Sequence, residues 1–388
     1  MQPDRTGPGI YVHFPFCIKK CHYCDFNSRV AASAERDLYL TALSREIEKR
    51  AAEWDGVQFE TVYFGGGTPT TYPPGVLVWV LEYLREHYCV VPDAEITLEA
   101  NPDTVTPGDL DALLEAGFNR LSLGVQSLRD DDLRFLGRTH DAETAVRAYL
   151  AARAAGWRNV NVDLIRGLPM HTADSWRRVL EEVVELAPDH ISCYGLTLEP
   201  GTRLYARHSR GEFTMPDEDT QLELFRVTAD VLAVGGYEHY EVSNWAKPGR
   251  ACRHNINYWL NGDYVGLGAG AWSHRGDVRW ANISDVRAYI VQASRGGDTT
   301  EQRDEPARWP RIVEHVTLAL RLVGGVGWDH LAMLAGGEER LRLRSAFEEL
   351  ARDGLVWFND GSIGPTWRGL MLLNEVGCRL LQADAQPG

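Results

Sequence analysis

Short apolar runs recur through the first half of the chain, and most are followed by a stretch with apolar residues at helical spacing. The runs are Ile10–Phe14, Thr61–Phe64, Glu95–Ala100, Arg120–Gly124, Val160–Ile165 and His190–Leu196. Helical spacing appears in residues 37–54, 75–87, 141–155 and 175–186. Strands alternating with helices predict βαβ units and a parallel sheet. Six such units favour an α/β fold, an incomplete TIM-type (β/α)6 barrel, with a flat doubly wound sheet as the alternative.

Polar residues mark the ends of these runs. In either fold the loops after the strand C-termini build the site. The polar positions there are Gly65, Gly66, Gly67, Thr68, Glu99, Asn101, Gln126, Asp163, Tyr194 and Gly195. We therefore expect the site at this edge of the sheet.

The second half of the chain changes character after Phe213. A helix is predicted over 217–234, short strands over 237–242 and 264–267, and a polar linker over 294–306. Helical spacing from residue 309, a β-hairpin within 354–366 and a helix over 367–381 predict a C-terminal winged-helix-like module. We expect a partial barrel in residues 1–213, a barrel extension in 214–300 and the C-terminal domain in 301–388.

Charge and hydropathy narrow the range of possible functions and cell compartments. The 388-residue chain has 40 Lys and Arg against 55 Asp and Glu, a net charge of −15. Nucleic-acid binding is disfavoured, because phosphate contacts need concentrated cations. No apolar signal core and no run of roughly 20 apolar residues is visible. These features predict a cytoplasmic protein whose thiols stay reduced.

Three cysteines, Cys17, Cys21 and Cys24, stand in the spacing C-x3-C-x2-C. A structural zinc site normally closes with four ligands, and His22 is too close to the cysteines to bend in easily. A cubane iron–sulfur cluster held by three thiolates instead keeps one iron free for another ligand. The spacing favours a 4Fe-4S cluster, with zinc as the alternative.

The residues around the cysteines add a family resemblance. "CIKKCHYCDF" after the first strand, with "GGGTPT" after the second, resembles the radical S-adenosylmethionine (SAM) superfamily. That resemblance implies that the amino and carboxylate groups of SAM chelate the open iron. Further runs, "YVHFPFC", "LEANPDT", "RLSLGVQS", "LGRTHD" and "DLIRGLP", resemble the branch of oxygen-independent coproporphyrinogen oxidase and the haem chaperone HemW.

The resemblance also implies which residues bind SAM. At the positions that match, these are Tyr11, Gly66, Gly67, Thr68, Glu99, Gln126, Arg138, Asp163 and Gly195. Glu99 suits the ammonium group, Asp163 or Gln126 the ribose hydroxyls, and Arg138 a carboxylate.

Two segments separate the members of this branch. The oxidase pattern has a fourth cysteine where this chain has Phe26, and Phe26 is the HemW pattern. "CRHNINYW", residues 252–259, matches the HemW signature H-N-x-x-Y-W, which makes His254 the candidate haem ligand. Trp272 stands where the family often has histidine, with His274 two residues later.

The resemblance therefore implies a haem chaperone that binds haem as cargo beside a 4Fe-4S cluster and SAM. The expected partners are haem-accepting proteins, including membrane-associated respiratory complexes, and a second copy of the chain. A radical SAM methyltransferase acting on an aromatic ring or a peptide-derived heterocycle is the alternative. Coproporphyrinogen oxidation is the least favoured activity.

Overall fold

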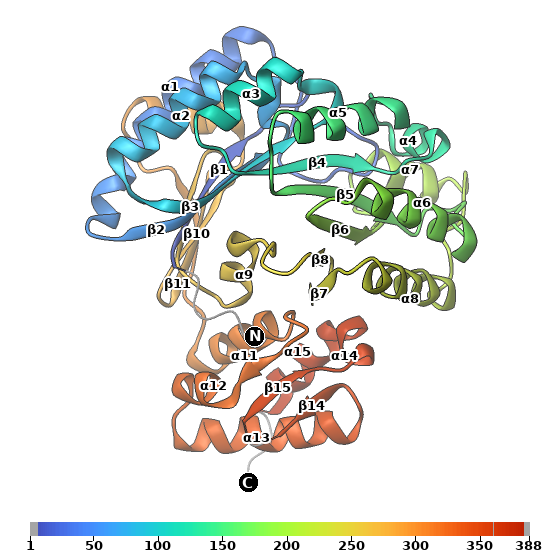
Figure 1. The fold of residues 1–388 in the computed structure, drawn as a ribbon. Coiled ribbons are helices and arrows are strands. Elements are labelled where there is room, and N and C mark those ends of the chain that lie inside the picture. Colours follow the sequence, from blue (N-terminus) through green and yellow to red (C-terminus); the bar gives the residue numbers. More distant parts are fainter. Residues whose placement is uncertain (1–6, 360, 384–388) are drawn as a thin grey trace.

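The computed structural model describes residues 7–359 and 361–383, apart from the side chains of residues 330, 332 and 333. It shows a curved sheet with helices along its outer face and a smaller module below (Figure 1). The sequence predicts that the N-terminus has no apolar signal core. Most of that stretch, residues 1–6, lies outside the described residues.

Six neighbouring parallel strands form the centre of a twelve-stranded sheet. They are β1 (Gly9–Phe14), β2 (Gln58–Gly66), β3 (Cys89–Ala100), β4 (Arg120–Gln126), β5 (Val160–Arg166) and β6 (His190–Gly195). The six predicted strands are confirmed, although β2 and β3 begin several residues earlier than their apolar runs. Because the strands pair in chain order, their carboxyl ends meet at one rim, as in a partial barrel.

Helices between the strands cover the outer face of the sheet (Figure 1). They are α1 (Ser33–Ala51), α2 (Pro74–His87), α3 (Pro107–Glu115), α4 (Asp130–Leu136), α5 (Ala142–Ala154) and α6 (Ala173–Leu186). Three short 3₁₀ turns are η1 (Ala52–Trp54), η2 (Pro69–Thr71) and η3 (Pro102–Thr104). Helices α3 and α4 are short, and helical spacing did not reveal them.

The chain then extends the sheet at both edges. Beyond β6 lie α7 (Arg203–Ser209), α8 (Glu218–Val234), β7 (Glu238–Glu241), β8 (Asn244–Ala246) and α9 (Arg253–Trp259). Beyond β1 lie β9 (Tyr264–Leu267), β10 (Trp272–Arg275), β11 (Val278–Asn282), α10 (Val286–Ser294) and β12 (Thr300–Asp304).

The predicted linker over 294–306 is wrong in its centre. Residues 300–304 form β12, which pairs with β11 at the edge of the large sheet. Four of its five residues are exposed. A charged, exposed edge strand carries no alternation of apolar and polar residues, so its sequence resembles a linker.

The last part of the chain folds around its own apolar core. It contains α11 (Arg308–Ala319), β13 (Val326–Gly327), α12 (Trp328–Leu334), α13 (Gly337–Arg352), β14 (Val356–Phe358), β15 (Ser362–Pro365), α14 (Trp367–Met371) and α15 (Leu373–Gln382). Helices packed on a three-stranded sheet agree with the winged-helix-like expectation. Among the described residues, no helix is long and apolar enough to span a membrane.

The two faces of the central strands differ in polarity. In β4, Leu121 and Leu123 belong to the core under the helices, whereas Arg120, Ser122 and Gly124 line a cavity inside the curve. Successive side chains of a strand point to opposite faces, so this alternation places one apolar and one polar surface on the same sheet. The polar inner face of the sheet lines the cavity that is described below as the candidate cofactor site.

A buried carboxylate ties α1 to the extension of the sheet. Glu46 is 2% exposed. It accepts hydrogen bonds from Gly268 N at 2.7 Å, Tyr289 Oη at 2.6 Å, Asn282 Nδ2 at 2.7 Å and Thr299 Oγ1 at 2.8 Å. The four donors come from the segments around β9, β11, α10 and β12, so Glu46 holds this edge of the sheet in place.

We predict that Glu46→Ala lowers the free energy of unfolding by about 3–5 kcal/mol, because it leaves four buried donors without their acceptor and removes a carboxylate 3.8 Å from Arg50 Nε. Urea denaturation measures the change. Glu48→Ala, two residues away in α1 at an exposed ion pair, is the matched control and should cost less than about 1 kcal/mol. Equal losses in the two variants would contradict the role given to Glu46.

Candidate cofactor site

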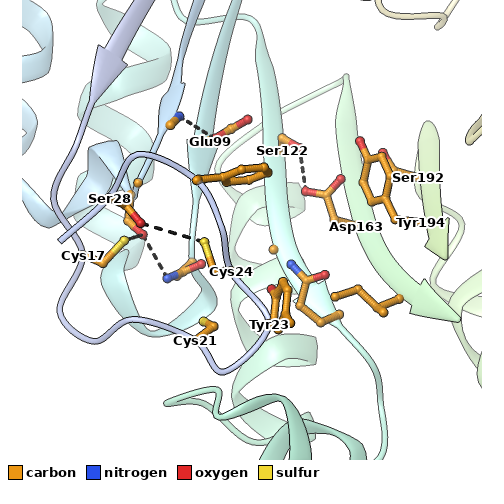
Figure 2. A pocket seen from close by; sticks show the side chains of 18 of the residues that line it. Cys17, Cys21, Tyr23, Cys24, Ser28, Glu99, Ser122, Asp163, Ser192 and Tyr194 are labelled. Carbon is orange, nitrogen blue, oxygen red and sulfur yellow. Dashed lines mark hydrogen bonds between the residues drawn. The ribbon is translucent and has the colours of Figure 1, made fainter. Parts of the chain in front are cut away.

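A cavity of about 350 Å³ opens at the carboxyl ends of the parallel strands and continues along the polar face of the sheet. Figure 2 shows the loop that carries Cys17, Cys21 and Cys24 at one side, with Glu99 and Asp163 on strands at the other. The cavity is large enough for a small organic ligand.

The cysteine loop, residues 15–32, joins β1 to α1 and has little regular structure of its own. Backbone bonds fix it at several points: Cys17 N donates to Arg29 O at 3.0 Å, and His22 N to Leu136 O at 2.9 Å. The Asn27 amide donates to Ala269 O at 3.0 Å and to Ser284 O at 2.9 Å. The loop is thus held by elements far away in the sequence.

Each of the three thiols has a polar neighbour. Thr68 Oγ1 donates to Cys17 Sγ at 3.5 Å, Arg138 Nη1 donates to Cys21 Sγ at 3.3 Å, and the Ser28 hydroxyl lies 3.8 Å from Cys24 Sγ. Burial raises the pKa of the Cys17 and Cys24 thiols, while these hydroxyls lower it in part. Hydrogen bonds to sulfur stabilise the thiolate form that binds metal.

The three thiols have the chemistry that an iron–sulfur cluster requires. Within the described part of the chain, no three His, Cys, Asp or Glu side chains converge as the ligands of one metal ion. In a cubane cluster each thiolate binds a separate iron, so the sulfur atoms need not converge. The residues present therefore fit a 4Fe-4S cluster with one iron open.

The glycines of the "GGGT" loop are required by close packing. Gly66 has a φ of +108°, and a Cβ there would lie 2.4 Å from the His13 ring. A Cβ on Gly67 would lie 2.7 Å from Phe14 O and 2.9 Å from Phe16 N. The loop is therefore pressed against the strand that leads into the cysteine loop, and larger residues would separate the two.

Glu99 is a partly neutralised carboxyl group inside the cavity. It accepts hydrogen bonds from Tyr63 Oη at 2.7 Å and from Gly66 N at 3.2 Å. Burial raises the pKa of Glu99 to about 7, against the lowering effect of the Tyr63 bond. Such a group gains most from a cationic ligand, and the ammonium of SAM is one.

The other polar side chains at the rim are also held in place. Arg138 Nη2 donates to Asn101 Oδ1 at 2.6 Å and to Gly124 O at 2.7 Å. Asp163 accepts from Ser122 Oγ at 3.0 Å (Figure 2). Gln126 has a φ of +70°, a backbone conformation that costs free energy in a non-glycine residue and is typical of functional sites.

The cavity brings together most of the residues predicted from the sequence. Its lining includes the three cysteines, Gly66, Gly67, Thr68, Glu99, Gln126, Arg138, Asp163 and Gly195. Tyr11 and His254 do not line it. The Tyr11 hydroxyl instead lies 3.0 Å from His13 Nδ1.

His254 is packed inside the protein beneath the site. It is 1% exposed, and its ring stacks on Tyr63 with 5.2 Å between the ring centres. Thr61 Oγ1 lies 2.7 Å from its Nδ1, and Tyr258 Oη lies 2.8 Å from its Nε2. Burial lowers its pKa to about 3, so the ring is neutral. Both ring nitrogens already have hydrogen-bond partners. Nδ1 could bind iron only after separating from Thr61, and Nε2 only after separating from Tyr258.

The backbone at the start of α9 is capped by a strand of the sheet. Glu95 of β3 accepts hydrogen bonds from Arg253 N and His254 N, both at 3.1 Å. A carboxylate at these free amide groups stabilises a helix start. The H-N-x-x-Y-W segment is therefore bound to the base of the cavity by its backbone as well as by its histidine.

Sequence reasoning missed the deeper part of the cavity. Its further polar or aromatic lining includes Tyr63, Arg120, Ser122, Asn161 and Ser192. Several of these are the inward members of an alternation within a predicted strand. Reading that alternation as a polar face, rather than only the strand ends, would have revealed them.

Comparison with known proteins agrees with this geometry. The radical SAM superfamily model matches residues 11–183. The solved coproporphyrinogen III oxidase HemN from Escherichia coli, a radical SAM enzyme, superposes with a TM-score of 0.83 at 27% identity, covering 96% of this chain and 90% of that one. The cysteine loop and the partial barrel thus define a radical SAM protein.

Curated relatives then identify the family. The haem chaperone HemW of Mycobacterium tuberculosis is 36% identical over 96% of this chain and 94% of its own. HemW of Bacillus subtilis is 33% identical over 94% and 97%, and HemW of Escherichia coli 39% over 74% of each chain. The chain belongs to the HemW family, and this family carries a 4Fe-4S cluster and SAM.

We predict that Cys17→Ala, Cys21→Ala and Cys24→Ala each abolish the 4Fe-4S cluster after anaerobic loading with iron and sulfide, because each iron depends on one thiolate. Iron and sulfide analysis with absorption spectra measures the loss. Cys378→Ala, at an exposed thiol outside the cavity, is the control and should keep the cluster. A full cluster in the Cys21→Ala protein would contradict the assignment.

We also predict that SAM affinity depends on the ionisation of Glu99. Because the pKa of Glu99 is raised to about 7, the carboxyl group is mostly protonated below that pH and must lose its proton to bind an ammonium. Affinity should therefore fall by up to about tenfold per pH unit as the pH drops below 7.

Calorimetry with the cluster-loaded protein compares the wild type with Glu99→Gln. The variant should lose this pH dependence and bind SAM roughly ten- to a hundredfold more weakly at pH 8. Glu199→Gln, at another glutamate of the cavity lining, should keep the wild-type profile. The same pH profile in the wild type and Glu99→Gln would refute the role of Glu99.

Proposed function

We propose that this protein is a haem chaperone, which binds haem and passes it to proteins that require it. The observation that carries the proposal is the match to curated HemW chaperones along nearly the whole chain, at 33–36% identity over 94–96% of it. The C-terminal module is part of that match, so the similarity is wider than the shared radical SAM barrel. Phe26, where the oxidase pattern has a fourth cysteine, supports the same proposal.

Different residues of the site bind the cluster and SAM. When bound, the cluster supplies an electron-transfer centre with one iron open to the amino and carboxylate groups of SAM. Cys17, Cys21 and Cys24 hold the cluster, and Thr68 and Arg138 donate to the sulfur atoms. We propose that Glu99 binds the SAM ammonium and that Asp163 and Gln126 bind ribose hydroxyls, since all three line the same cavity.

The aromatic side chain of Phe26 stands beside this cavity and is 62% exposed. An exposed phenyl ring next to Lys19 and Lys20, which also line the cavity, combines an apolar surface with positive charge at the cluster loop. Haem has an apolar ring and two carboxylates, so this rim suits its approach.

The family resemblance supports three finer proposals. The first is that residues 1–213, 214–300 and 301–388 are functional units. The others are that the recipients of haem include membrane-associated respiratory complexes and that the protein acts as a homodimer.

His254 remains the proposed haem ligand, and its packing sets a condition on that role. The ring must leave Thr61 or Tyr258 before either nitrogen can bind iron. A neutral imidazole is the form that coordinates haem iron, and burial keeps His254 neutral. Haem binding through His254 therefore requires that α9 or the ring moves.

We predict that His254→Ala shifts the absorption spectrum of the haem-loaded protein or weakens haem retention. Thr61→Val, which removes the hydroxyl beside Nδ1 with little change of shape, should release the ring and strengthen haem binding by roughly fivefold, about 1 kcal/mol. Haemin titration of both variants measures the effects. Unchanged spectrum and affinity in His254→Ala would overturn the ligand assignment. A wild type that binds no haem but methylates a substrate with SAM would overturn the chaperone proposal.

A further inference from the structure

One buried cation in the cavity has no partner. Arg120 is the first residue of β4, is 2% exposed and lines the cavity. Its Nε is buried without a hydrogen bond, and no residue in the described part of the chain accepts a bond or forms an ion pair with its guanidinium group. An unpaired buried charge is costly, so its retention calls for an explanation.

The nearby carboxylates act on it only from a distance: among the described residues, none accepts a hydrogen bond from Arg120 or forms an ion pair with it. Glu95 is occupied by the amide groups at the start of α9. Asp163 is occupied by Ser122 Oγ and, at 2.8 Å, by Asn161 Nδ2. Glu99 is occupied by Tyr63 and Gly66. Each acid within reach of the cavity floor thus has donors of its own, and the guanidinium group of Arg120 is left over.

Arg120 stays charged in this position. Burial alone would lower its pKa, but Cys252 and Glu95 raise it above the usual value. Thr97, its partner in the strand register, also has a buried Oγ1 without a hydrogen bond in the described structure. A guanidinium group and a hydroxyl on adjacent strands are thus free to donate.

The position of Arg120 separates it from the cysteine loop. Gln126 and Gly124 lie at the carboxyl end of β4, near the cysteine loop, whereas Arg120 begins the strand. Six residues of strand span roughly 20 Å. Asn161 and Asn255 also line the cavity and add neutral polar groups to its lining. The cavity therefore has a second polar end.

We propose that Arg120 binds a carboxylate group at the floor of the cavity, at the opposite end from the cluster. A guanidinium group binds a carboxylate through two parallel hydrogen bonds, and this geometry would satisfy the buried cation. The carboxylate belongs either to a small free acid or to a propionate of haem. Binding of a free acid does not depend on the proposed haem chaperone function.

Calorimetry with acetate and its neutral isostere acetamide tests the site in the cluster-loaded wild type. Acetate should bind and acetamide should not. Arg120→Gln should weaken acetate binding about tenfold or more, and Arg120→Lys, which keeps the charge, should retain part of it. Arg166→Gln is the matched control, since Arg166 is a largely buried guanidinium on the next strand, bonded to Gln221 and outside the cavity lining.

Haemin and haemin dimethyl ester distinguish the two sources of the carboxylate. If the group is a propionate of haem, the ester binds more weakly than haemin to the wild type, and Arg120→Gln removes this difference. If the group belongs to a free acid, acetate binding depends on Arg120 whereas haemin and its ester bind alike. The absorption spectrum of the cluster, measured in the same variants, shows that the cysteine loop and the fold around it are intact.

The proposal is overturned if acetate and acetamide bind alike and haemin and its ester also bind alike. It is overturned as well if Arg120→Gln leaves both acetate binding and the haemin preference unchanged. Should Arg120→Gln fail to fold, the wild-type comparison of charged and neutral ligands, together with Arg120→Lys, decides the question. Loss of haem binding with Arg120-dependent acetate binding would refute the chaperone function alone.

Discussion

A polar surface buried inside a curved sheet is the constraint on which this structure depends. The parallel strands hide their apolar side chains under helices, so the remaining side chains point into a closed space where water cannot satisfy every group. The molecule meets this constraint with side-chain bonds between strands, such as Ser122 to Asp163 and Tyr63 to Glu99. The cavity for the cofactors is the part of that space that protein atoms do not fill.

The H-N-x-x-Y-W segment belongs to the same network. His254 stacks on Tyr63, which in turn bonds to Glu99, while Glu95 holds the start of α9. A change in this segment therefore reaches Glu99, the acid proposed to bind SAM, through two direct contacts. A haem-binding role and a structural role are compatible here, because movement of the histidine on ligand binding would alter the support of Glu99.

The fold was predictable because six strand patterns recur with helical spacing between most of them, and the cysteine spacing pointed to a cluster without any structure. The edge strand at 300–304 was missed since charge and exposure remove its pattern. Chemistry deep in the cavity was missed for a different reason. Arg120 is the first polar residue of an alternating strand, and sequence alone does not show that its guanidinium group is buried without a hydrogen bond from Nε. The packing of His254 likewise depends on contacts with Thr61, nearly two hundred residues away.

Helix α9 also joins the C-terminal module to the barrel. Its Ile256 belongs to the core of the C-terminal module, and the Arg321 guanidinium carbon lies 4.2 Å from the centre of the Trp259 ring, while His254 on the same helix packs beneath the cavity. Three of its seven residues, His254, Ile256 and Asn257, are buried. Evolution of the C-terminal module is therefore tied to that of the barrel: a substitution that repacks one must be tolerated by the other, and the module cannot be exchanged between relatives without its matching helix.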